Sequence, residues 1–294
     1  MYTKDDPRAA LSGFASATDT GIAAPEYHDY TRFAPDEPGT WVSRAQNMVI
    51  AYTRPTLGCR LGAFDLTHEH VLLLVQDSSA VQVTSGDDTV TLHGQGLIVI
   101  PPGPGAITAL GEGDVVRLVQ ADEPGWAERA RNAASYDTPH PRVAPLIPWP
   151  EPVDGDRLRV HPLADIPEDP KRFGRIFRTR AFMVNFLPPT IGPRDPSQLS
   201  PHHHDDFEQV SLAVAGEFVH HIRTPWTADS HTWRDDDHQS VASPSTTVIP
   251  PPTVHTSAAT GRGLNQLIDI FSPPREDFSD QPGWVLNAEQ YPRP

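Results

Sequence analysis

Two short segments of the sequence together hold the side chains of a mononuclear metal site. The first contains His202, His204 and Glu208, and the second brings His255 shortly after a run of three prolines. Alternate residues of a β-strand face the same side, so the first three side chains share one face if a strand continues through them. Imidazole nitrogens with one carboxylate suit iron, manganese, nickel, cobalt or zinc and leave coordination positions open for a substrate. The pattern therefore predicts a metal centre that performs chemistry.

Two neighbouring residues leave the ligand set partly open. His203 has the opposite strand parity and is predicted to face away from the metal. Gln209 is an alternative to Glu208, because four residues separate it from His204. We favour Glu208, since both its charge and its parity fit a ligand.

The spacing of these residues resembles the two motifs of the cupin superfamily. The family's first motif runs His-x-His, three or four residues, then Glu, and its second contains Pro-x-Gly-x-x-His. The sequence matches the first at His202, His204 and Glu208, and the second over residues 250–255, with Pro252 where the family has Gly. The resemblance implies that these three residues and His255 bind one metal ion, and some similar enzymes also use the carboxylate, here Glu208, as a catalytic base.

An internal repeat indicates two halves of one architecture. Residues 69–75 align with residues 208–214, and residues 99–103 align with residues 248–252. The offset grows from 139 to 149 between the two pairs, so the second half carries about ten extra residues, which we place within 220–243.

The first half is predicted to lack a metal. In the repeat alignment the three histidines fall on Ala63, Asp65 and Ala106. A rival registration takes His68 and His70 as the first motif, but it offers no carboxylate at the required spacing. We expect both histidines to be ordinary strand residues.

Short β-branched segments between Gly, Pro, Asp and Ser clusters predict an all-β chain of two similar halves. The resemblance implies two antiparallel double-sheet jelly-roll barrels, a bicupin. We predict a first barrel over 1–138, a proline-rich linker over 139–174 and a metal-bearing barrel over 175–294. The clearest strands are predicted at 48–53, 71–76, 115–120, 181–187 and 264–271, and a helix at 126–135.

Composition restricts the partners and the compartment. The 23 basic and 38 acidic side chains give a formal charge of -15, which argues against nucleic acid or an anionic membrane as a partner. The sequence shows no secretory signal and no membrane-spanning run, and its single cysteine, Cys59, fits a reducing compartment. We therefore expect a cytoplasmic protein, as a monomer or a homodimer.

Three residues outside the motifs are candidates for substrate binding. Arg180 could pair with a substrate carboxylate if it lies beside the metal, although a salt bridge at a strand end explains it equally well. Asn185, on the same predicted strand, and Gln266, on the strand after His255, are further pocket candidates. Histidines of the 220–243 insertion either cover the barrel mouth or decorate a loop, and we favour the loop.

The function that we expect first is an Fe(II)-dependent dioxygenase or related oxidoreductase acting on a small organic substrate, because cupins with two barrels and one site often belong to that class. An isomerase, lyase or decarboxylase using manganese, nickel or zinc is the alternative, since the same ligands serve both chemistries. A binding protein without turnover is the third possibility.

Overall fold

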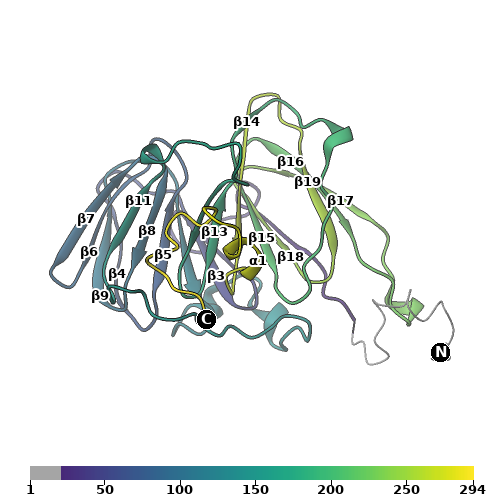
Figure 1. Ribbon diagram of the computed structural model, residues 1–294, viewed down its shortest axis with the longest axis horizontal. Coiled ribbons are helices and arrows are strands. Elements are labelled where there is room, and N and C mark those ends of the chain that lie inside the picture. Colours follow the sequence, from purple (N-terminus) through teal and green to yellow (C-terminus); the bar gives the residue numbers. More distant parts are fainter. Residues whose placement is uncertain (1–20) are drawn as a thin grey trace.

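The computed structural model describes residues 21–294, which form two β-barrels side by side (Figure 1). Each barrel pairs a large antiparallel sheet with a smaller one, so the prediction of two antiparallel double-sheet barrels in one chain is confirmed. The large sheet of the first barrel has the order β11 (Arg159–Pro162), β8 (Gly96–Ile100), β5 (His70–Leu74), β10 (Val115–Gln120), β3 (Met48–Thr53) and β2 (Thr40–Arg44). Its small sheet has the order β4 (Arg60–Leu66), β9 (Gly103–Ala109), β6 (Ala80–Ser85) and β7 (Asp88–His93).

The second barrel repeats this plan. Its large sheet has the order β1 (Glu26–Asp29), β18 (Ser245–Ile249), β15 (Gln209–Ala215), β20 (Leu264–Phe271), β13 (Met183–Phe186) and β12 (Arg175–Arg178), and β14 (Thr190–Ile191) also pairs with β20. Its small sheet has the order β17 (Asp237–Ala242), β16 (Glu217–Arg223) and β19 (Val254–Ala259). The extra residues predicted for this half are largely the segment 224–236 between β16 and β17, where the first barrel joins β6 to β7 by two residues.

The strand predictions are confirmed, and the helix prediction is wrong in type. The strands at 48–53, 115–120 and 264–271 have the predicted bounds. Residues 126–135 form two short 3-10 turns in place of one helix, because their apolar side chains pack locally against β2 and β3. The helical elements are η2 (Ala127–Arg129), η3 (Ala133–Tyr136), η4 (Leu163–Asp165), η5 (Pro196–Gln198), η6 (Ser230–Thr232) and α1 (Glu276–Ser279).

The two halves exchange their first strands. β1 precedes the first barrel in sequence but pairs with β18 of the second, and β11 precedes the second barrel but pairs with β8 of the first. The predicted linker over 139–174 is therefore not a bare connection, since it supplies an edge strand. Pro162 is tolerated there because an edge strand leaves one side without ladder partners.

The two large sheets pack face to face and share one apolar core. Its members come from both halves and include Tyr52, Leu73 and Val99 of the first and Phe182, Val210 and Ile268 of the second. This burial holds the barrels in a fixed relation. No helix in the part of the chain that the structure describes is long and apolar enough to span a bilayer.

Candidate metal centre

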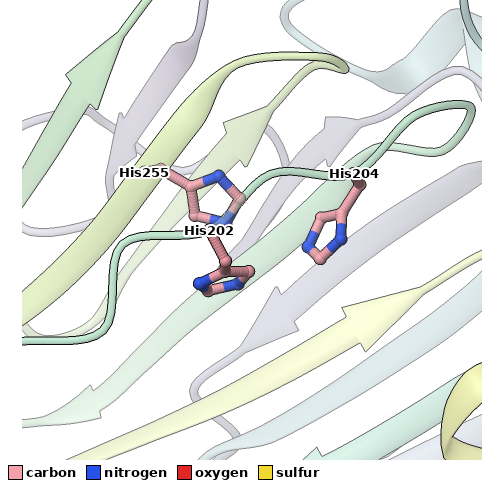
Figure 2. A group of neighbouring side chains, drawn as sticks. All are labelled: His202, His204 and His255. Carbon is pink, nitrogen blue, oxygen red and sulfur yellow. The ribbon is translucent and has the colours of Figure 1, made fainter.

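Three histidines meet at one end of the second barrel (Figure 2). His202 and His204 lie on the segment before β15, and His255 lies on β19. Their ligand nitrogens all lie within 4.8 Å of one another. The backbones of His202 and His255 exchange two hydrogen bonds of 3.0 and 2.8 Å, which anchors the segment 202–204 to the barrel wall.

Local contacts orient each imidazole ring. The Nδ1 atom of His202 lies 2.9 Å from the carbonyl oxygen of Ser200, and Nδ1 of His255 lies 3.0 Å from that of Thr253. An Nδ1–H bonded to a carbonyl leaves the Nε2 lone pair free for a metal. The ring of His204 stacks on Phe207 at a centroid distance of 4.6 Å.

Gln209 places an oxygen among the histidines. Its Oε1 atom lies 2.8 Å from Nε2 of His204 and 3.2 Å from Nε2 of His255. Its Nε2 atom donates to Ser211 Oγ at 2.9 Å and to Asp269 Oδ1 at 3.3 Å. These two acceptors fix the amide so that its oxygen faces the histidines.

Glu208 points to the other side of the sheet, so the structure does not bring it to the histidines. Its Oε2 atom accepts a hydrogen bond of 2.6 Å from the Gln46 backbone N–H, and its Oε1 atom accepts one of 3.1 Å from the Tyr136 hydroxyl. The parity argument fails because residues 205–207 form a bend, so that no continuous strand runs from His204 to Glu208. The spacing alternative, Gln209, occupies the position that the sequence interpretation gave to Glu208.

The other histidines near the motifs take no part in this cluster. His203 is exposed and lies 3.4 Å from Asp205, as its parity predicts. In the first barrel, His70 is buried with its Nδ1 atom 3.2 Å from an Arg117 nitrogen, and His68 faces Asp122 at the surface. Among the residues that the structure describes, the three histidines of the second barrel form the one group of three or more potential ligands close enough to share an ion.

The surroundings of the cluster keep two of its histidines, His204 and His255, uncharged. Burial lowers the pKa of His204 to about 3 and that of His255 to about 3. Neutral imidazole is the form that binds a metal. Burial also raises the pKa of Asp269, the carboxyl group beside Gln209. Three imidazole nitrogens and an amide oxygen fit a divalent ion of the first transition series.

A cavity of about 510 Å³ opens directly beside the cluster. His202, Gln209, His255 and Asp269 form its polar end. Its remaining wall is largely apolar, with Phe173, Leu187, Pro188, Ile191, Pro193, Phe218, Ala259 and Leu267 among the lining residues. A pocket of this size with a few convergent polar groups is typical of a small-molecule site.

The three predicted substrate residues do not line this cavity. Arg180 donates through Nε to the carbonyl of Trp149, and Gln266 donates to Gln95 at the junction of the barrels. Asn185 is fully buried on β13, where it pairs with Asp269 of the neighbouring strand β20. The structure does not bring these three residues to the cavity, because strand neighbours are set by long-range pairing that the local sequence does not contain.

The histidines assigned to a loop divide between two places. His220 and His221 belong to β16, where His220 is buried with Nδ1 2.8 Å from Ser257 Oγ. His231 lies in the exposed connection to β17, and His238 lies on β17 itself opposite His221. The cavity residues Asp269 and Phe218 gave no motif signal in the sequence.

Comparison with known proteins supports the fold. No protein-family model matches the chain, and no curated protein matches it by sequence. Solved structures do match. The oxalate decarboxylase of Lactobacillus farciminis, in its formate complex, is 13% identical with a TM-score of 0.54, covering 88% of this chain and 89% of that one.

Two further structures give the same result. AerE from Microcystis aeruginosa is 9% identical with a TM-score of 0.54, covering 86% of this chain and 99% of that one. The oxalate decarboxylase of Bacillus subtilis, described with Mn(II) centres, is 11% identical with a TM-score of 0.55, covering 91% and 84%. These likenesses show the bicupin fold, and at such low identity they show the fold alone.

Proposed function

We propose that this protein is a metal-dependent bicupin enzyme of the non-redox type, a decarboxylase or lyase acting on a small organic acid. The observation that carries the proposal is the convergence of His202, His204, His255 and the Gln209 oxygen at the polar end of a cavity. We prefer manganese to the iron expected from the sequence, because a structural neighbour of the same fold is an oxalate decarboxylase with Mn(II) centres.

The chain's own residues have separate tasks in this proposal. The three histidines and Gln209 would hold the ion, which when bound supplies a Lewis acid that stabilises negative charge developing on the substrate. Asp269 and Ser211 position Gln209 through its amide nitrogen. The apolar wall limits water around the reacting group. Glu208 is not proposed as a catalytic base, since its carboxylate is engaged on the far side of the sheet.

Metal analysis combined with a gas assay tests this function. The protein, purified without a histidine tag and loaded with Mn²⁺, is expected to hold about one equivalent of metal, as one ligand cluster implies. With a panel of carboxylic acids we expect CO₂ or an elimination product, without stoichiometric consumption of oxygen.

The matched variants are His204→Ala and His203→Ala, neighbouring residues of which only the first joins the cluster. The proposal requires metal and activity to be lost in the first variant and kept in the second. Oxygen consumed in step with substrate would restore the dioxygenase interpretation. Absence of metal in the wild-type protein would leave a binding protein.

A further inference from the structure

The second barrel carries small or polar residues at positions where the first barrel has large apolar side chains. The repeat alignment and the strand pairings match Leu72, Leu74 and Ile98 of the first barrel with Ser211, Ala213 and Thr247 of the second. In the first barrel these three side chains belong to a buried apolar cluster. The second barrel has thus lost interior side-chain volume at paired positions.

The wall of the cavity is suited to the hydrocarbon part of a ligand. Phe218, Ala259 and Leu267 line it and also pack together in an apolar cluster that Leu187 joins from the edge. A substrate as small as a two-carbon acid would leave most of the 510 Å³ without contacts. Apolar walls of this extent favour a ligand with an apolar body.

The two arginines of the lining already use guanidinium nitrogens for hydrogen bonds within the protein. Arg194 donates to the carbonyl oxygens of Ser257 and Gln198. Arg172 donates to the carbonyl of Pro167 and lies 3.8 Å from Asp169. Asp269, the acidic residue of the lining, already accepts hydrogen bonds from Gln209 and Ser211.

We propose that the site takes a monocarboxylic acid with an apolar body of several carbons, its carboxylate at the metal centre and its body against Phe218, Leu187 and Leu267. This inference rests on the proposed function, because the metal ion provides the contact for the carboxylate. It distinguishes the site from one built for a short dicarboxylate such as oxalate.

A homologous ligand series tests the proposal. Mn²⁺-loaded protein is titrated with acetate, butanoate, hexanoate and octanoate, and binding is measured by calorimetry. We expect affinity to rise about threefold to fourfold for each methylene that enters the apolar wall. Adipate, which has the carbons of hexanoate and a second carboxylate, is expected to bind at least about tenfold more weakly than hexanoate, since its second charge would have to leave water for the apolar wall.

Two variants locate the binding of the apolar body. Ala259→Leu, which narrows the cavity beside Phe218, is expected to weaken octanoate at least about tenfold and acetate less than about twofold. Ala63→Leu, the same change at an exposed position of β4, is the control and should alter neither. Leu187→Ala, which enlarges the cavity, should lower the affinity for hexanoate without changing that for acetate.

The outcomes separate the two proposals. If Mn²⁺ does not bind, both fail. If Mn²⁺ binds and affinity does not change with chain length, the proposed metal site stands and the apolar substrate class is overturned. Equal binding of adipate and hexanoate overturns the single-carboxylate requirement.

Discussion

The two barrels share a frame and differ in what fills it. Strand order and register repeat between the large sheets, down to the pairs Leu72 with Ile98 and Ser211 with Thr247. The first interior is closed by apolar side chains, and the ring of Phe64 lies directly against Gly105. The second interior holds a smaller apolar cluster and opens into the cavity beside the histidines. Within the described residues, the difference places both the ligand cluster and the cavity beside it in the second barrel.

The frame includes a reciprocal clamp between the barrels. Glu208 accepts hydrogen bonds from the first half, from Gln46 N–H and the Tyr136 hydroxyl. Glu69 accepts them from the second half, from Arg180 N–H at 3.3 Å and the Tyr291 hydroxyl at 2.7 Å.

Each tyrosine belongs to a segment held by an asparagine. Asn132 and Asn287 each bond to both backbone groups of an arginine, Arg44 and Arg178 respectively, at 2.9 and 2.8 Å. The repeated glutamates therefore join the barrels and lie outside the histidine cluster.

Removal of one imidazole from the cluster should have the largest effect on metal binding. We expect His204→Ala to lower Mn²⁺ affinity by more than about 100-fold, because the cluster loses one of three nitrogens that are close together. His70→Ala, a buried histidine of the other barrel, is the matched control and should leave affinity unchanged. Competition titration against a fluorescent chelator measures both, and equal effects would show that the loss is only a folding defect.

Substitution of Gln209 should have the next largest effect. We expect Gln209→Leu to lower Mn²⁺ affinity about 10- to 100-fold, since it removes the oxygen beside His204 and His255. Gln209→Glu should bind the ion at least as tightly as the wild type, because it supplies a charged oxygen at the same place. An unchanged affinity in the leucine variant would remove Gln209 from the ligand set.

The hydrogen bonds that Glu208 and Glu69 accept across the barrels should contribute equally to the free energy of unfolding. Neither contribution should depend on bound metal. We expect Glu208→Gln and Glu69→Gln each to cost about 1–3 kcal/mol of the free energy of unfolding, because an amide nitrogen then faces a buried donor. Urea denaturation of the metal-free proteins measures this. Glu208→Gln should keep Mn²⁺ affinity within about threefold, and a loss like that of His204→Ala would return Glu208 to the metal site.

The sequence predicted the frame well because its signals are local. The strands at 48–53, 115–120 and 264–271 follow from β-branched runs between turn residues, and the repeat predicted the second barrel. The histidine cluster followed from two short motifs. Local parity failed at Glu208 because of the bend at residues 205–207.

A signal for the true role of the glutamate was nevertheless present. Glu69 repeats Glu208 in the half that lacks the other ligands, which indicates a role unrelated to metal. The pairing of Gln209 with Ser211 and Asp269 could not be predicted in this way. Asp269 is 60 residues from Gln209 in sequence, and only the sheet brings them together.

The last of these effects concerns acid stability and His70, the residue that the first barrel has in place of Gln209. Burial, with the nearby charge of Arg117, lowers the pKa of His70 to about 2. Its unfolded value is about 6.5, so below that pH the unfolded chain binds a proton that the folded chain does not. His70 thus contributes stability above pH 6.5 that is lost as the pH falls toward 2. Between pH 7 and pH 5 the loss is about 2 kcal/mol.

We expect His70→Gln, which copies the second barrel, to reduce the drop in unfolding free energy over this range by that amount. Urea denaturation at both pH values measures it, with His203→Gln as the exposed control. An undiminished drop in the His70 variant would mean that His70 takes up its proton in the folded protein.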